Sequence, residues 1–319
     1  FPADIGTPGA TTVPAYMFYE IVRKLPDGAQ VSLANSGDAT QMIIRAGRSR
    51  FTLQTLPDSD FPDLAAGTLD HKFSLPAVEL RRLIEKTQFA ISTEETRYYL
   101  NGIFMHTTEV EGHLMLRAVA TDGHRLALVT VGRQGTTPEE EVKVILPKKT
   151  LLELAKLLGE GDGEIQYERG ENHLFFTVGS RVLVSRMIDG QFPAYERVIP
   201  KGNDKQIDFE RERLTSAVKR VALLSNERSR AVKLEIAKGQ VEVTSSSSEF
   251  GEAREVIAVD FAGPALTISF NAQYVLDFLN VVDTDVVSLS LKDEVSQAVM
   301  KPVGSTVCDY TYVIMPMRI

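Results

Sequence analysis

The sequence is poor in several residue types, and each scarcity narrows the class of protein. It has one cysteine, Cys308, and no tryptophan among its 319 residues. A single thiol excludes a disulfide framework and a cluster of thiolate metal ligands, and it favours a reducing cytoplasm. Glycine (22) and proline (14) are too few for a fibrous or disordered chain. No apolar run approaches the roughly 18 residues that cross a bilayer, so we expect no membrane partner.

What the sequence does contain is repetition. Three stretches open with Pro14, Pro147 or Asn271, residues that suit the start of a helix. Apolar residues then recur at helical spacing, and short segments with the alternation of a strand follow. Two further helix patterns place Leu80 and Leu214 in equivalent positions, 134 residues apart. A period of this length is too long for a solenoid and indicates duplicated domains.

The repeat predicts an α+β fold, with two helices in each domain packed against antiparallel sheets. A hairpin is expected within 114–131, because Asp122–Gly123 joins two alternating runs. The expected units are the second half of a first domain, a complete second domain and a complete third domain, at residues 1–66, 67–199 and 200–319. About 60 residues of the first domain are therefore expected to be missing from the front.

Charge is distributed unevenly along the chain. The whole sequence carries −8, yet the helical stretches carry twelve basic and seven acidic residues, so the helices are at +5 and the rest is at −13. A charged helix face is usually a solvated surface. Because the domains are repeated, basic faces on their related helices also predict one shared basic surface, which would bind phosphates without base specificity. The stretches are 14–25, 76–90, 147–158, 209–224 and 271–282.

The histidines and carboxylates match no familiar catalytic or metal motif. The segment HTTEVEGH, 106–113, has two His and two Glu, but it is typical of strand, turn and strand, which would separate them. Asp122 and His124 could support acid–base chemistry, although a histidine positioned in a β-turn is the stronger interpretation. Phosphate-binding, nucleophile-elbow and dinucleotide motifs are absent from the sequence. We expect no enzyme, metal or cofactor, and a hydrolase using Asp122 and His124 stays an alternative.

The chain ends in apolar residues with no polar tail. Met315, Pro316, Met317 and Ile319 are expected to pack against the protein. The end of the chain could simply dock into the core, or it could form the wall of a groove. Methionine suits the second role, because its side chain adapts to varied apolar partners.

Several strings, in order along the chain, resemble the bacterial sliding clamp family, the β subunit of DNA polymerase III. They are RYYLNGIFM (97–105), ATDGHRLAL (120–128), DGQFPAYERVIP (189–200), the SNE within LLSNERSR (223–230), FNAQYVLDFLN (270–280) and YVIMPMRI (312–319). The resemblance covers essentially the whole chain. It implies tandem clamp domains that form part of a ring, and two chains that close head to tail into a homodimer with helices around the hole.

The function implied by this resemblance is that of a DNA polymerase processivity factor in the cytoplasm. Such a ring encircles double-stranded DNA without sequence specificity. It tethers the replicative DNA polymerase, the clamp loader and repair proteins through short peptide motifs. The alternative is a peptide-docking scaffold that does not enclose DNA because its first domain is truncated.

The resemblance also implies a DNA surface and a dimer interface. Arg97, Tyr98 and Tyr99 match a family segment that touches DNA at the rim of the hole. Basic residues expected in the lining, from helix position, are Arg81, Lys86, Lys148, Lys149 and Arg213. Residues expected at the dimer interface are Met17 and Ile21 on one chain and Leu223 and Leu224 on the other.

Finally, the resemblance implies a pocket between the second and third domains for a partner peptide, in which glutamine precedes hydrophobic and aromatic residues. Gln297 stands where the family often has serine, which affects the local shape. One wall would comprise Leu100, Thr121, Gly123, His124, Arg125, Leu126, Pro193, Arg197 and Val198. The other would comprise Tyr274, Val295, Val313, Ile314, Met315, Pro316, Met317 and Arg318.

Overall fold

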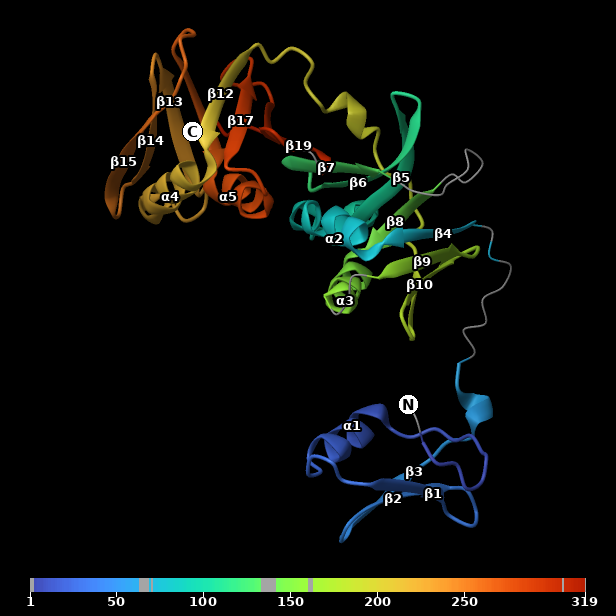
Figure 1. Ribbon diagram of the computed structural model, residues 1–319. Helices are drawn as coiled ribbons and strands as arrows, with labels where there is room; N and C mark the ends of the chain where they lie inside the picture. Colours follow the sequence, from blue (N-terminus) through green and yellow to red (C-terminus); the bar gives the residue numbers. More distant parts are fainter. Residues whose placement is uncertain are drawn as a thin grey trace. The chain divides into compact units, whose positions relative to one another are not determined.

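The structure of the chain is a computed structural model that describes residues 3–62, 69, 71–132, 142–159, 163–305 and 307–318. It divides into two compact units, Phe1–Ala65 and Ala66–Ile319. Figure 1 shows both units, and each is described by itself.

The smaller unit has one helix and one three-stranded antiparallel sheet of order β1-β2-β3. Its described core is thin and comes from alternate residues of β2, namely Met42, Ile44 and Ala46. The helix has no buried residue, so its apolar side chains stay largely open to solvent. The elements are α1 (Ala15–Arg23), β1 (Val31–Asn35), β2 (Gln41–Ala46), β3 (Ser49–Gln54) and η1 (Asp58–Asp60).

The larger unit contains the repeat that the sequence predicts. Its first half runs strand, helix, four strands, helix and three strands. These elements are β4 (His71–Pro76), α2 (Ala77–Glu85), β5 (Gly102–Val110), β6 (His113–Thr121), β7 (Arg125–Gly132), β8 (Lys143–Pro147), α3 (Lys148–Leu158), β9 (Glu164–Arg169), β10 (His173–Val178) and β11 (Arg181–Arg186).

The second half follows the same order. Its elements are β12 (Lys205–Glu210), α4 (Arg211–Val221), β13 (Ala231–Ala237), β14 (Gln240–Ser247), β15 (Gly251–Ala258), β16 (Leu266–Asn271), α5 (Ala272–Val281), β17 (Val286–Leu291), β18 (Ala298–Pro302) and β19 (Asp309–Ile314). The short 3-10 segments between these elements are η2 (Gln88–Ala90), η3 (Glu95–Leu100), η4 (Tyr195–Arg197) and η5 (Ala222–Leu224).

The two halves share one eight-stranded antiparallel sheet, of order β12-β17-β18-β19-β7-β6-β5-β8. Four strands come from each half. The halves join where β19 pairs with β7, from Asp309 opposite Thr130 to Ile314 opposite Arg125. Each half also has its own four-stranded sheet, β11-β10-β9-β4 and β15-β14-β13-β16. The expected α+β fold with antiparallel sheets is confirmed.

The helices lie along one side of the eight-stranded sheet (Figure 1). Leu80 and Ile84 of α2, and Leu214 and Val218 of α4, are fully buried, as the repeated spacing predicts. Pro14 and Pro147 precede helices at the N-cap, and the Asn271 side chain accepts from two backbone amides at the start of α5. No helix in the described part of the chain is long and apolar enough to span a membrane.

The opposite face of this sheet carries a second, smaller apolar cluster. Side chains alternate between the two faces of a strand, so Leu126 and Leu128 point away from the helices. The segment 187–199, called here the strap, lies over this face. It inserts Phe192 and Tyr195 into the cluster, where they are 7% and 2% exposed. The strap is therefore held by buried aromatic rings.

Candidate functional site

A cavity of about 270 Å³ opens beside the strap, where both halves of the large unit meet. Its walls come from η3, from the β6–β7 turn, from the strap and from the segment after β19. We call it the Met315 cavity. The lining residues are Arg97, Tyr99, Leu100, Thr121, Gly123, His124, Arg125, Leu126, Pro193, Val198, Val313 and Met315.

The β6–β7 turn is fixed by its own side chains. The Asp122 carboxylate accepts from the backbone amides of His124 and Arg125, at 3.0 and 3.1 Å. The Thr121 hydroxyl donates to the carbonyl of Arg125 at 2.7 Å. Gly123 has φ +90°, and a Cβ there would lie 3.0 Å from a guanidinium nitrogen of Arg97. The positive φ therefore favours glycine here, and a larger residue would also require the Arg97 side chain to shift.

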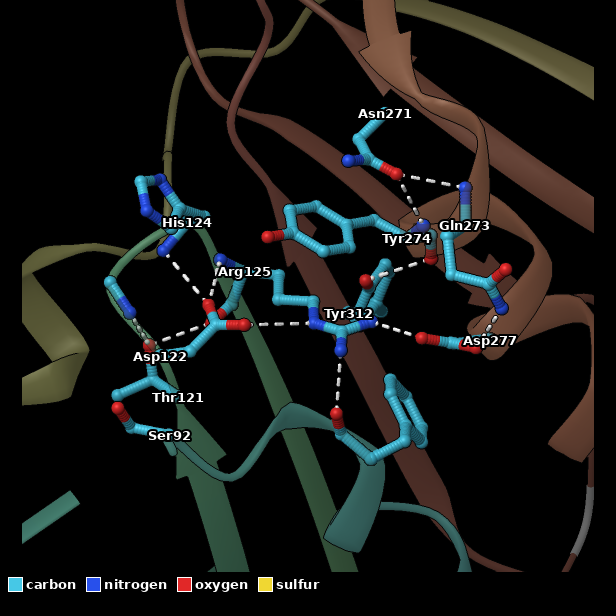
Figure 2. A network of polar contacts seen from close by, with 12 residues as sticks. Ser92, Thr121, Asp122, His124, Arg125, Asn271, Gln273, Tyr274, Asp277 and Tyr312 are labelled. Carbon is cyan, nitrogen blue, oxygen red and sulfur yellow. Dashed lines mark hydrogen bonds and ion pairs between the residues drawn. The ribbon is translucent and has the colours of Figure 1, made fainter. Parts of the chain in front are cut away.

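Arg125 connects this turn to the second half of the unit, as Figure 2 shows. Its guanidinium donates to Asp122 at 3.1 Å, to Asp277 of α5 at 2.5 Å and to the carbonyl of Phe89 at 2.6 Å. It also lies over the ring of Tyr274, 4.2 Å from the centroid. Its side chain is only 9% exposed. Arg125 thus joins the two halves of the unit through hydrogen bonds, and its side chain also lines the cavity.

The electrostatics of Arg125 agree with this geometry. Burial opposes the charged form, but the Tyr312 hydroxyl and the carboxylates of Asp277 and Asp122 outweigh it, and the pKa of the guanidinium is raised. A positive charge at this position is permanent. It can orient a polar group that enters the cavity.

The end of the chain forms the other wall. The backbone amide of Met315 donates to the carbonyl of His124 at 2.9 Å, and that of Met317 donates to the carbonyl of Ser269 at 2.7 Å. The His124 ring stacks against Tyr274, with centroids 6.5 Å apart. The terminal segment is therefore fixed by its backbone, while the Met315 side chain lines the cavity. Ile319 lies outside the described residues.

Most of the residues expected in the peptide pocket lie around this one cavity. The structure brings ten of them together: Leu100, Thr121, Gly123, His124, Arg125, Leu126, Pro193, Val198, Val313 and Met315. Arg97 and Tyr99 also line it, although they were expected at a DNA surface. Their closeness in sequence to Leu100, an expected pocket residue, was the available signal.

The other expected pocket residues lie elsewhere. Ile314 is a correction, because it is 0% exposed and its side chain faces the helix side of β19. Tyr274 reaches the site only through its contacts with His124 and Arg125. Val295 is 58% exposed in the loop before β18. The seven expected residues outside the lining are Arg197, Tyr274, Val295, Ile314, Pro316, Met317 and Arg318.

The basic residues expected at a DNA surface divide into two kinds. Lys148, Lys149 and Arg213 are exposed in the first turns of α3 and α4. Arg81 is half-buried and donates to the carbonyl of Leu158. Tyr98 is 55% exposed beside Tyr99.

Lys86 is a correction to the expected DNA surface. It is 5% exposed, and its ammonium donates to the carbonyl of Val281 and to Asp283, both at 2.8 Å. It also lies over the ring of Tyr310. An ammonium enclosed at the junction of the two halves does not face a duplex, so we remove Lys86 from the set.

The residues expected at a dimer interface belong to both units. Met17 of α1 is 49% exposed and Leu223 of η5 is 77% exposed. Ile21 and Leu224 are half-buried. Large apolar side chains this open to water are typical of contact surfaces.

The geometry offers no support for hydrolysis by Asp122 and His124. The Asp122 carboxylate is used by two backbone amides and by Arg125, and its contact with His124 is to the backbone rather than the ring. In the segment 106–113, β5 ends at Val110 and β6 begins at His113, as expected. Among the described residues, no group of three or more His, Cys, Asp or Glu is placed to hold a metal ion.

Comparison with protein families gives three matches in succession along the chain. They are the N-terminal, central and C-terminal domains of the DNA polymerase III beta subunit, matched by residues 2–65, 74–194 and 196–318.

Individual relatives agree. The chain is 44% identical to the "Beta sliding clamp" of Caulobacter vibrioides, over 99% of this chain and 84% of the relative. It is 40% identical to that of Escherichia coli, over 98% and 82%. A crystal structure of a sliding clamp from Bartonella birtlesii bound to griselimycin is 43% identical, covers 100% of this chain and 84% of its own, and has a TM-score of 0.91. The three tandem domains, the eight-stranded sheet and these relatives lead to one conclusion: the chain belongs to the family of the DNA polymerase III β subunit, the bacterial sliding clamps.

Proposed function

We propose that this protein is a replication processivity factor, a ring that encircles duplex DNA and tethers the DNA polymerase. Its relatives are sliding clamps rather than enzymes. The ring would form from two chains joined head to tail, with Met17 and Ile21 of one chain against Leu223 and Leu224 of the other. The proposed domains are residues 1–66, 67–199 and 200–319. The proposed compartment is the cytoplasm.

The proposed DNA surface is formed by the exposed basic residues of the helices. Lys148, Lys149 and Arg213 are exposed, so their side chains can approach the phosphates of a duplex without contacting particular bases. Arg81 adds positive charge beside α3. Arg97 and Tyr98 would reach the duplex from η3. Attraction of this kind depends on counterion release, so it holds DNA of any sequence and still permits sliding.

The proposed partner site is the Met315 cavity, and the convergence of four chain segments on it carries this proposal. Leu100, Leu126, Val313 and Met315 supply an apolar lining, and Arg97, His124 and Arg125 stand at its edge. Because the β6–β7 turn and the terminal segment are fixed by hydrogen bonds, they lose little conformational freedom when a peptide enters. The proposed occupants are short glutamine-containing motifs of polymerase, clamp loader and repair proteins.

Peptide binding tests this site. A fluorescent peptide with glutamine followed by leucine and phenylalanine should bind the protein, and Met315→Ala should weaken binding about tenfold by removing apolar contact. Met317→Ala is the matched control, since Met317 is in the same segment but outside the lining. Equal effects of the two substitutions would show that the peptide binds elsewhere.

DNA retention tests the ring. After loading, the protein should remain on circular DNA and slide off linear DNA, because only a closed ring is topologically linked. Equal loss from both substrates would favour the alternative, a peptide-docking scaffold that does not enclose DNA.

A further inference from the structure

His106, on β5, is half-buried against the strap at a position that the proposed peptide site does not use. Its ring lies between Phe104, stacked at 4.8 Å between centroids, and Tyr195, at 5.8 Å. Phe104 in turn stacks on Phe192 at 4.9 Å. These four rings of β5 and the strap thus form one aromatic cluster, with Tyr195 tilted against the other rings, and this cluster holds the strap on the sheet.

The hydrogen bonds of His106 determine which ring nitrogen carries the proton. Nδ1 lies 2.8 Å from the carbonyl of Thr107, which can only accept, so Nδ1 is protonated. Nε2 lies 2.9 Å from the hydroxyl of Tyr195 and therefore accepts a hydrogen bond from it. Arg117 donates to the same hydroxyl at 3.4 Å. In this arrangement the Tyr195 hydroxyl donates to His106 and accepts from Arg117.

A second proton on His106 would disturb this arrangement. Nε2 would become a donor, so the Tyr195 hydroxyl could no longer donate to it and would have to turn its proton elsewhere. The new positive charge would lie between Arg117 of β6 and Lys143 of β8, the direct cross-strand neighbours of His106. Glu196 of the strap opposes this repulsion and is the remaining acceptor near Tyr195. Burial, the largest influence, disfavours the charged ring, with Arg117 and Lys143 adding to it, and the pKa of His106 is lowered.

Protons can reach His106 because it lines a second cavity, of about 690 Å³, on the other side of the strap from the Met315 cavity. Arg169, Glu171 and Asp189 also line this His106 cavity. The strap residue Pro193 lines both cavities, and Tyr195 follows it by two residues. Val198, which lines the Met315 cavity, donates from its backbone amide to the carbonyl of Tyr195 at 2.9 Å. Movement of Tyr195 would therefore be passed to two residues of the Met315 cavity wall.

We propose that the bond between neutral His106 and Tyr195 is a pH-sensitive latch that positions the strap for partner binding. His106 is a positioning residue, and it acts on the Met315 cavity through Tyr195, Pro193 and Val198. The inference rests on the proposed peptide site. Protonation of His106 ends the donation from Tyr195 and adds a positive charge beside Arg117 and Lys143, which loosens the strap, so partner peptides bind more weakly in mildly acidic solution.

The experiment measures peptide affinity by fluorescence polarisation at a series of pH values from about 7.5 down to about 5, because the pKa of His106 lies below the ordinary histidine value. The unsubstituted protein should lose about fivefold in affinity, at the low end for coupled sites. His106→Gln retains an acceptor for the Tyr195 hydroxyl and does not titrate, so it should bind normally and lose much less. His113→Gln, at an exposed position of the same hairpin, should behave as the unsubstituted protein does.

His124 lines the Met315 cavity in every variant, so its contribution cancels in this comparison. If His106→Gln follows the same pH profile as the unsubstituted protein, the latch is wrong. If neither the unsubstituted protein nor any variant binds the peptide at any pH, the proposed peptide site is wrong. Hydrogen exchange then tests separately whether His106 holds the strap. The Val198 amide should exchange faster at about pH 5 than at about pH 7.5 once intrinsic rates are corrected, except in His106→Gln. Equal protection at both pH values would overturn the latch.

Discussion

The guanidinium of Arg125 on β7 donates to the carboxylate of Asp277 on α5, which lies 152 residues further along the chain. With the pairing of β7 and β19, this contact fastens the two halves of the large unit at the edge of the Met315 cavity. Both side chains are mostly buried, at 9% and 19% exposed. The same residue therefore supports the junction of the two halves and the wall of the cavity.

Arg125→Ala should be strongly destabilising. It removes the shared partner of Asp122, Asp277 and the Phe89 carbonyl, and it leaves two partly buried carboxylates without their cation. Removing one member of such a buried pair costs about 3 kcal/mol in the free energy of unfolding. The urea midpoint measured by circular dichroism should fall accordingly, and peptide affinity should fall with it.

Arg220→Ala is the matched control for the loss of an arginine ion pair. Arg220 also binds a carboxylate with two nitrogens, that of Glu255, but its side chain is 60% exposed. Solvent screens such a pair, so its removal should shift the urea midpoint far less. Comparable shifts for the two variants would show that Arg125 is an ordinary surface ion pair.

Lys148→Ala combined with Lys149→Ala should lower the salt dependence of DNA binding. Both side chains are exposed at the start of α3, and each phosphate that is no longer neutralised by a lysine reduces the slope of log K against log salt by about 0.9. Binding to duplexes of different sequence should weaken equally. The measurement is a titration of fluorescent DNA at several salt concentrations.

Lys86→Met provides the contrasting variant for this measurement. The Lys86 ammonium is engaged by Val281 and Asp283 within the protein, so its removal should leave the salt slope unchanged. It should instead lower the urea midpoint, because the Val281 carbonyl loses its donor. A reduced slope in Lys86→Met would restore this residue to the DNA surface.

The helices and the repeat could be predicted from the sequence because both depend on local rules. Apolar spacing placed Leu80 and Leu214 in equivalent buried positions, and Asn271 marked the start of α5 as a capping residue. The turn at Asp122 and Gly123 followed from the need for positive φ. Each of these features is decided within a few residues of chain.

The composition of the cavity could not be derived in this way. Tyr99, Pro193 and Met315 meet only because β19 pairs with β7 and the strap lies across the sheet. Residue spacing carries no record of such a meeting, and the resemblance to known clamps supplied it. The same limit explains Lys86, since a basic residue at the end of a helix looks solvated until the neighbouring domain is placed.

Leu223→Asp should prevent self-association. Leu223 is 77% exposed on η5 and is proposed to face α1 of a second chain, where a carboxylate would have to be desolvated against apolar side chains. Light scattering after size exclusion should show a fall from twice the chain mass to the mass of one chain. Val110→Asp is the control, at an apolar position 37% exposed near the β5–β6 turn, and it should leave the mass unchanged. An unchanged mass in Leu223→Asp would exclude Leu223 from the interface.

The stability of the protein should decrease as the pH falls below about 6.5, with His106 as one cause. Burial, reinforced by Arg117 and Lys143, holds the pKa of His106 in the folded state below its ordinary value of 6.5. Between these two pKa values the unfolded chain binds the proton and the folded chain does not, so the free energy of unfolding falls as the pH is lowered. The decline from this residue should begin near pH 6.5 and stop below its folded-state pKa.

Urea unfolding at a series of pH values measures this effect. The difference between the unsubstituted protein and His106→Gln isolates the histidine, because every other titrating group is common to both. That difference should change by up to about 1.4 kcal/mol for each pH unit within the window. His113→Gln, whose ring is exposed in the folded state, should follow the unsubstituted protein. Parallel curves for the unsubstituted protein and His106→Gln would mean that His106 takes up its proton as easily when folded as when unfolded.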